Sequence, residues 1–247
     1  MGTIKNTTVC YNGLRWSISF QTEYEEVVEP RPKDSVVGID VGVANFAALS
    51  TRELIAPLNS FKKVESKLAK EQKKLSRKTK FSNNWKKQKR KIRRVHAKIA
   101  DTRKDFLHKL STNISKNHAV VVLEDLKVSN LSKSAKGTKE DPGKNVKQKS
   151  GLNKSILDQG WHMFKTYLEY KQNYSGGEVV LVAPHHTSQK CFKCESISQR
   201  NRLSQSKFSC VACGHEDHAD INAALNIQAA GTAVLAYRYI GAGTRQA

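Results

Sequence analysis

The sequence predicts an α/β protein with a mixed β-sheet. Apolar runs typical of buried strands occur at residues 36–50, 119–125 and 178–183, and segments with helical periodicity lie between them. The chain has 247 residues, of which 38% are hydrophobic. This is enough for one sizeable core and a small additional module.

The pattern predicts three strands near the N-terminus. Residues 14–20 alternate between apolar and polar side chains, which indicates a half-buried strand. Residues 36–40 and 41–50 follow as adjacent strands on either side of Gly42.

A basic helical hairpin is predicted next, at residues 61–80 and 83–117. Each helix has one apolar stripe, and the turn-prone sequence TKFSNN joins the two. Residues 61–98 contain 17 Lys or Arg and two acidic residues, within a chain of net charge +21. Such charge favours a polyanionic partner, because each neutralised phosphate releases counterions. A solvated basic tail is the alternative, which the apolar stripes disfavour. The candidate nucleic-acid contacts are Lys73, Lys74, Arg77, Lys78, Lys86, Lys87, Arg90, Arg93 and Arg94.

The remaining segments follow the same logic. Residues 129–154 are rich in Ser, Lys, Gly and Asn and predict a mobile basic loop. Ser155 is a suitable N-cap for a helix that passes Tyr170 and ends at Gly176-Gly177. Residues 219–230 predict an Ala-rich helix, and the tail from Gly241 is expected to be disordered.

Three acidic residues occupy comparable places in this pattern. Asp40 lies in the first core strand, Glu124 ends the next buried strand, and Asp220 begins the last helix. Each could be an ordinary strand-end or capping residue. If they converge, they form an oxygen-rich site suited to two Mg²⁺ ions about 4 Å apart, as in phosphodiester hydrolysis. Asp125 is the rival to Glu124, but strand alternation sends the two to opposite faces.

Four of the five cysteines are clustered in a CxxC…CxxC pattern, with 15 residues between its two pairs. This spacing predicts one structural Zn²⁺ held by Cys191, Cys194, Cys210 and Cys213. His215 and His218 are alternative ligands, although the cysteines already complete a tetrahedron. The N-terminus lacks a secretory signal, and no apolar run reaches the roughly 18 residues of a membrane span. We therefore expect an intracellular protein.

Several stretches together resemble the C-terminal part of the TnpB/OrfB family of transposon-encoded RNA-guided nucleases, which are related to type V CRISPR effectors. They are GIDVGVANFAALS, RKDFLHKLST with VVVLEDLKVSNL, GLNKSILDQGWHMFKTYLEYK, and HTSQKCFKC with CVACGHEDHADINAALNI. The resemblance implies a RuvC-like domain of RNase H-like fold, with Asp40, Glu124 and Asp220 as Mg²⁺-dependent catalytic acids. It also implies a zinc ribbon that helps to load the target strand. A guide RNA and target DNA would be the partners, in a prokaryotic cytoplasm or nucleoid.

The resemblance also implies a domain organisation. We expect residual strands of a wedge-like β domain at 1–32, the hairpin at 61–117, the ribbon at 185–217 and a tail at 236–247. The RuvC-like domain would take residues 33–60, 118–184 and 218–235. Family members are commonly longer, so we expect that the recognition lobe is absent and that a separate chain could supply it. Glu195 departs from the family pattern, which usually has Gly after the first CxxC pair.

Two other functions remain open at this point. A nuclease-inactive relative could bind RNA or DNA as a regulator or remnant. A cut-and-paste transposase could use a similar set of three acids, although the family's guide-dependent organisation fits the motifs better.

Overall fold

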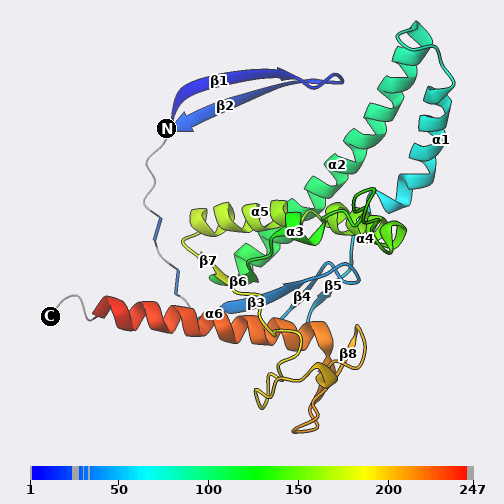
Figure 1. Ribbon diagram of the computed structural model, residues 1–247. Coiled ribbons are helices and arrows are strands. Elements are labelled where there is room, and N and C mark those ends of the chain that lie inside the picture. The colour runs from blue at the N-terminus through cyan, green and yellow to red at the C-terminus, as the bar shows by residue number, and fades with distance from the viewer. Residues whose placement is uncertain (1, 24–27, 30, 33, 244–247) are drawn as a thin grey trace. The chain divides into compact units, whose positions relative to one another are not determined.

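The computed structural model describes residues 2–23, 28, 29, 31, 32 and 34–243 (Figure 1). The chain forms two compact units. The first comprises Met1–Glu29 and Asn59–Phe106, and the second comprises Pro30–Leu58 and Leu107–Ala247.

The first unit begins with an antiparallel hairpin of β1 (Thr3–Tyr11) and β2 (Trp16–Glu23). Every residue of both strands is exposed. The predicted half-buried strand at 14–20 is therefore wrong in its burial and begins two residues later. Alternation predicts burial only where another layer covers one face, and within this unit no described element does so for these strands.

The first unit also contains the helical hairpin, as predicted. A short 3₁₀ helix, η1 (Lys62–Val64), leads into α1 (Glu65–Ser76), and α2 (Asn83–Asn117) continues from this unit into the second. The predicted stripes are partly buried, at Leu68 of α1 and at Ile92 and Ile99 of α2. Buried Gln88 donates to the Glu71 carboxylate over 2.6 Å, so the polar group within the seam is satisfied.

The second unit contains a five-stranded mixed sheet in the order β5-β4-β3-β6-β7. Strand β3 pairs antiparallel with β4 and parallel with β6, and β6 pairs parallel with β7. This confirms the predicted α/β class and mixed sheet. The strands are β3 (Val36–Val41), β4 (Ala47–Leu49), β5 (Leu54–Ile55), β6 (Val120–Glu124) and β7 (Glu178–Val182).

Helices cover both faces of this sheet. Helix α6 (Ala219–Gly243) lies along one face and α5 (Trp161–Tyr174) along the other (Figure 1). Val120 and Val122 of β6 pack with Ile227 and Leu235 of α6 in one cluster. On the other face, the rings of Phe46 and Phe164 meet edge to face at 5.1 Å.

Helix α6 approaches the sheet closely at glycine positions. A Cβ atom on Gly38 of β3 would lie 2.2 Å from the carbonyl oxygen of Ala224 and 2.5 Å from the backbone nitrogen of Gln228. On the helix side, a Cβ on Gly231 would lie 2.4 Å from the Val122 side chain. The helix can pack at this distance only because these positions lack side chains.

The predicted basic loop at 129–154 is wrong over much of its length. Its two ends are helical, in α3 (Val128–Leu131) and α4 (Val146–Gln159). Ser155 lies inside α4 and is not an N-cap. Gly160, with φ 75°, separates α4 from α5. The polar composition suggested a loop, but α4 is anchored by a few contacts such as buried Ile156.

The last helix is longer than predicted. It continues through Gly243, so the expected disorder from Gly241 is wrong for its first three residues. The rest of the expected tail, 244–247, lies outside the described residues.

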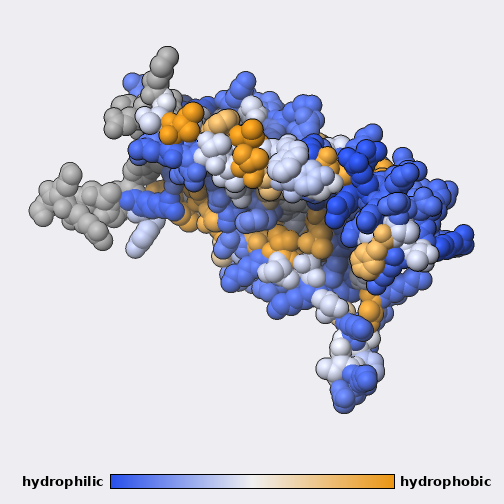
Figure 2. Space-filling view, turned by 90° about the horizontal axis from the view of Figure 1, so that it is seen from above, coloured by the Kyte–Doolittle hydropathy of each residue, from blue (hydrophilic) through white to orange (hydrophobic). Residues whose placement is uncertain are grey.

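The segment between β7 and α6 is small and contains little regular structure. It has a 3₁₀ turn, η2 (Gln199–Asn201), and an antiparallel pair of β8 (Lys207–Ser209) and β9 (Glu216–His218). Hydrophilic side chains cover most of the visible face of the molecule, and hydrophobic groups form separate patches (Figure 2). Within the described residues, no helix combines the length and hydropathy needed to cross a membrane.

We predict that Gly38→Ala lowers the free energy of unfolding by about 1–3 kcal/mol, because the new methyl group collides with the α6 backbone. Gly151→Ala is the matched control, since nothing lies within 4 Å of that position in α4. The control should be neutral or stabilising by up to about 1 kcal/mol. Urea denaturation measures both changes. Equal stability of Gly38→Ala and wild type would show that the close packing is not required.

Candidate metal-dependent active site

Asp40 and Glu124 are neighbours because of strand register. Ile39 of β3 pairs with Leu123 of β6 in the parallel ladder, so Asp40 and Glu124 each lie one residue further along. Adjacent strands are about 4.8 Å apart. Side chains alternate along a strand, and Val120 and Val122 of β6 pack against α6. Glu124 therefore also faces α6, and Asp40 shares that face with Gly38.

Asp220 approaches the same face from the first turn of α6. It lies one helical turn before Ala224, whose carbonyl contacts the Gly38 position. Its backbone N–H donates to Nδ1 of His218 over 3.3 Å, and its Oδ2 accepts from Nδ2 of Asn45 over 3.1 Å. The packing of α6 thus brings a third carboxylate to the pair on the sheet.

The electrostatics of Asp40 show that the three carboxylates interact. Burial raises the pKa of Asp40 to about 8, and the charges of Glu124 and Asp220 act in the same direction, while Arg202 opposes them. A carboxyl group that resists ionisation in this way is held at an unfavourable position. The site therefore concentrates negative charge that a cation would relieve.

Three polar residues contact these carboxylates, and the sequence pattern indicated none of them. Thr187 donates to Oε1 of Glu124 over 2.5 Å, and Arg202 donates to Oδ1 of Asp220 over 3.2 Å. Asn45, described above, is the third. Thr187 and Arg202 belong to the segment between β7 and α6, far from their partners in sequence. Only the fold identifies them.

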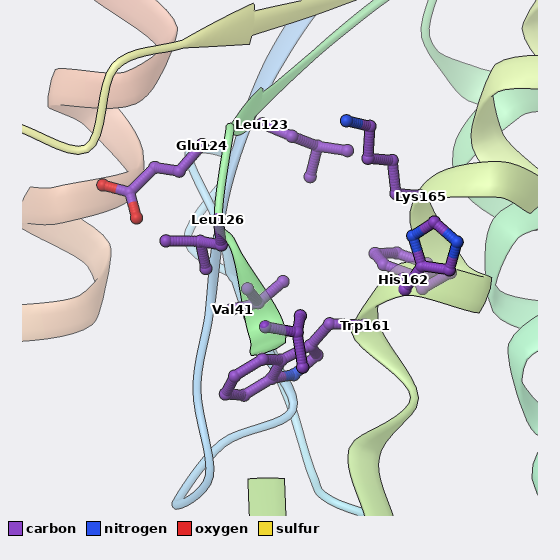
Figure 3. Close-up of a pocket in the computed structure, with 9 residues that line it drawn as sticks. Val41, Leu123, Glu124, Leu126, Trp161, His162 and Lys165 are labelled. Carbon is purple, nitrogen blue, oxygen red and sulfur yellow. The ribbon is translucent and has the colours of Figure 1, made fainter. Parts of the chain in front are cut away.

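Asp125, the rival of Glu124, faces the other way. Its carboxylate accepts from Nζ of Lys165 on α5 over 3.4 Å. A cavity of about 60 Å³ lies between the end of β6 and the start of α5; Glu124 is among its lining residues with Trp161, His162 and Lys165, and Asp125 is not. The carboxylate of Glu124 points away from these three residues, toward α6 (Figure 3). Alternation at the end of β6 therefore separates the two acids as predicted.

The donor set suits a hard divalent cation. Carboxylate oxygens are the ligands that Mg²⁺ prefers, and buried charges without a cation are costly. The carboxylates are nevertheless less tightly grouped than the cysteines. Among the described residues, only the four cysteines place one potential ligand atom each within 4.8 Å of all the others. Thr187 contacts the carboxylate of Glu124, and Asn45 and Arg202 both contact that of Asp220.

The four cysteines form a compact group that could hold a metal ion. The Sγ atoms of Cys191 and Cys213 are 3.8 Å apart, and those of Cys194 and Cys210 are 3.5 Å apart. Tetrahedral Zn–S bonds of about 2.3 Å place sulfur atoms about 3.8 Å from each other, which fits these distances. His215 and His218, the alternative ligands, are not members of the group.

The two CxxC loops have the same backbone geometry. The N–H of Glu195 donates to the Cys191 carbonyl over 2.8 Å, and that of Gly214 donates to the Cys210 carbonyl over 2.9 Å. Both residues have positive φ, 62° for Glu195 and 70° for Gly214. Glu195 thus adopts the conformation that glycine favours, at the position where the resemblance implies Gly.

Two buried asparagines on α6 hold the segment between β7 and α6, which contains the four cysteines and is called the cysteine segment below. They connect it to the helix that carries Asp220. Asn222 accepts from the N–H of Phe192 and donates to the Lys190 carbonyl, over 3.0 and 2.8 Å. Asn226 donates to the carbonyls of Thr187 and Lys190, over 3.0 and 2.7 Å. One helix therefore carries Asp220 and also holds the segment that supplies Thr187.

The candidate nucleic-acid contacts all lie in the first unit, on α1, on α2 or just after α1. Eight of the nine are exposed, and Lys78 is half-buried. Lys74 forms an ion pair with Glu71 at 2.8 Å. The apolar stripes are turned inward, so the cationic side chains are available on the outside of the hairpin.

Two family models match the chain. The OrfB_IS605 model, described as "Probable transposase", matches residues 19–135. The model described as "Cas12f1-like, TNB domain" matches residues 161–227, which include the four cysteines and Asp220. Both sets of candidate site residues therefore lie within matched regions.

Curated relatives match over nearly the whole chain. "Putative RNA-guided DNA endonuclease InsQ" of Escherichia coli K12 is 56% identical over 235 residues, which are 95% of this chain and 58% of that protein. "Putative RNA-guided DNA endonuclease" of Streptomyces pristinaespiralis is 38% identical over 224 residues, 90% of this chain and 51% of that protein. The chain thus spans little more than half the length of these relatives.

A solved structure shares the fold. It is titled "Cryo-EM structure of the Cas12f1-sgRNA-target DNA complex" and matches with a TM-score of 0.51 and 21% identity. The match covers 89% of this chain and 55% of that one.

Asp40→Asn should stabilise the protein at alkaline pH without divalent ions. Folding raises the pKa of Asp40 from about 3.9 to about 8. Below about pH 4 the carboxyl group is protonated in both the folded and the unfolded protein, so it costs no stability. As pH rises from about 4 through about 8, the unfolded state releases this proton more readily than the folded state, and the folded protein loses stability. At pH 8 the variant should be more stable by up to about 5 kcal/mol, the equivalent of about four pKa units. Mg²⁺ should raise the melting temperature of the wild type but not of the variant. Thermal melts across this pH range measure both effects.

Asp125→Asn is the matched control, because its carboxylate is more than half exposed and pairs with Lys165. It should follow the wild-type profile with and without Mg²⁺. If Asp40→Asn also follows that profile, the three carboxylates do not form a strained group.

Removal of the bound metal should unfold the cysteine segment. We expect one Zn²⁺ per chain by elemental analysis, and Cys194→Ser should lose it. Cys10→Ser is the control, since Cys10 lies outside the group of four and is exposed. Full zinc content in Cys194→Ser, or none in the wild type, would contradict the assignment.

Proposed function

This chain belongs to the TnpB/OrfB family of transposon-encoded proteins, related to the type V CRISPR effectors, and we propose that it is the catalytic part of an RNA-guided DNA endonuclease. The observation that carries the proposal is the position of Asp40 and Glu124 side by side on β3 and β6, facing Asp220 of α6. Because the chain spans only about half the length of its curated relatives, the activity of the whole protein is inferred.

We propose that the second unit is a RuvC-like domain of RNase H-like fold. The mixed sheet, with α5 on one face and α6 on the other, supports this. The proposed boundaries are those expected from the sequence: 33–60, 118–184 and 218–235 for this domain and 185–217 for the ribbon. The hairpin would take 61–117, residual wedge-like strands 1–32 and the tail 236–247.

We propose that Asp40, Glu124 and Asp220 hold two Mg²⁺ ions. When bound, these ions activate water and stabilise the leaving oxygen in phosphodiester hydrolysis. The protein's own residues orient the ligands: Thr187 positions Glu124, and Asn45 positions Asp220. Arg202 balances part of the negative charge and places a guanidinium where a DNA phosphate must approach.

The cysteine segment has a structural role in this proposal. A closed four-cysteine site has no open position for a substrate, so its Zn²⁺ contributes folding energy rather than chemistry. The folded ribbon then keeps Arg202 and Thr187 at the carboxylates. It would also help to load the target strand, as the resemblance implies.

The partners in this proposal are a guide RNA and a target DNA, in a prokaryotic cytoplasm or nucleoid. Base pairing would supply sequence specificity, while the cationic hairpin binds phosphates. Further protein, in this proposal a separate chain, would cover the parts of β1 and β2 beyond their turn. The exposed apolar side chains there support this: Ile4, Val9, Ile18 and Phe20.

We expect the purified protein to carry a discrete RNA and to cleave labelled single-stranded DNA in the presence of Mg²⁺. Asp40→Asn, Glu124→Gln and Asp220→Asn should each lower the cleavage rate by at least about 100-fold, because each removes a negatively charged metal ligand. Asp125→Asn should keep wild-type activity, because its side chain lies on the other side of β6. Gel assays measure the rates, and sequencing identifies the RNA.

Equal cleavage by wild type and Asp40→Asn would remove Asp40 from catalysis. Tight, salt-sensitive binding without cleavage by any form would favour the nuclease-inactive, nucleic-acid-binding alternative. Recovery of no discrete RNA would contradict guide dependence.

A further inference from the structure

The first unit contains a cleft that combines aromatic rings with positive charge. It measures about 320 Å³ and lies between the turn of the β1–β2 hairpin and the first turns of α2. Its aromatic residues are Tyr11 and Trp85, and its cationic residues are Lys86, Lys89, Arg90 and Arg93. No acidic residue lines it, and none occurs between residues 83 and 98.

The hairpin side of the cleft is well defined. The side chain of Asn12 accepts from the N–H groups of Leu14 and Arg15, over 3.0 and 3.1 Å, and fixes the turn. Gly13 has φ 85°, and a Cβ atom there would lie 2.5 Å from a guanidinium nitrogen of Arg93. Arg15 forms an ion pair of 2.7 Å with Asp101 of α2. These contacts lie within one unit and hold the turn against the helix.

The aromatic rings are available for stacking. Tyr11 is 50% exposed, and its ring centroid lies 4.8 Å from that of Trp16, a 71% exposed ring beside the cleft that is not part of its lining. Trp85 is half-buried against Phe81, and Nζ of Lys89 lies 4.7 Å from its ring centroid. Packing of Phe81 and Trp85 stabilises the α1–α2 turn but does not explain the exposed pair on the hairpin.

We propose that this cleft binds an unpaired nucleotide of single-stranded RNA, with its base on the aromatic rings and its phosphates on Arg90 and Arg93. Rings beside Lys and Arg suit a base attached to a phosphate backbone, whereas paired bases in a duplex present no free face. The cleft volume is at the lower end of small-molecule sites, about 300 Å³, which suits one nucleotide rather than a helix.

RNA is favoured over DNA as the occupant. A folded RNA displays unpaired bases permanently in loops and bulges, whereas duplex DNA must first be opened. The choice rests on the proposed function, in which RNA is a resident partner. Three of the nine cationic residues predicted to contact nucleic acid line the cleft, and in this proposal they lie beside the base: Lys86, Arg90 and Arg93.

The test measures binding of labelled 12-nucleotide single-stranded RNA, single-stranded DNA and duplex RNA by fluorescence anisotropy at several salt concentrations. All forms carry Asp40→Asn and have copurifying RNA removed, so the result is independent of cleavage. Tyr11→Ala and Trp85→Ala should each weaken single-stranded RNA binding by about 10- to 100-fold and leave the salt dependence unchanged. Arg93→Ala should instead reduce the salt dependence.

Duplex RNA binding should change less than twofold in the aromatic variants. Tyr11→Phe and Trp85→Phe should restore tight binding, and Tyr237→Ala, an exposed ring on α6, should have no effect. Circular dichroism checks that the variants fold, and Tyr11→Ala remains informative if Trp85→Ala fails to fold.

Equal losses for single-stranded and duplex RNA would overturn base stacking. Equally tight and equally sensitive DNA binding would overturn the choice of RNA. If protein with Asp40 intact fails to cleave DNA in the assay described under the proposed function, while the aromatic variants still show the stacking effect, the proposed function alone is contradicted.

Discussion

The close contact between α6 and β3 at Gly38 is the constraint on which the candidate active site depends. With a Cβ position only 2.2 Å from an α6 carbonyl, any larger residue would push the helix away from the sheet. Asp220 is one turn from that contact and Asp40 is two residues from it. The same helix holds the cysteine segment through Asn222 and Asn226, and so places Thr187 beside Glu124. One helix–strand contact therefore aligns three carboxylates and the residues that orient them.

The grouping of three carboxylates destabilises the folded protein. Buried carboxylates repel each other, and the raised pKa of Asp40 is the consequence. Thr187, Asn45 and Arg202 offset part of the repulsion by hydrogen bonding and opposite charge. A purely structural cluster gains nothing from such crowding, whereas a cation site requires it. Strain of this kind at a group of acids is characteristic of functional sites.

Local patterns predicted the parts of the fold that depend on local physics. The run at 119–125 is apolar because β6 is buried on both faces, and Glu124 and Asp125 separate because strand side chains alternate. The cysteine spacing predicted a group whose sulfur atoms lie close together in the structure.

Thr187 and Arg202 were not predicted, because their partners are 63 and 18 residues away and only the packing of α6 joins them. Most of α4 was missed because its sequence is polar, and the helix predicted from Ser155 onward ran through Gly160, where the structure separates α4 from α5. The burial of β2 was overestimated because alternation cannot show whether a covering layer exists.

The most direct measurement of the central claim is a crystal structure of the protein soaked in Mn²⁺, with anomalous data collected at the manganese and zinc edges. The account predicts manganese peaks within direct coordination distance of Asp40, Glu124 and Asp220, about 2.0–2.3 Å. It also predicts one zinc peak among the four cysteines, as an internal control. Zinc at the cysteines with no manganese at the three carboxylates would contradict the claim that they form one metal-dependent active site.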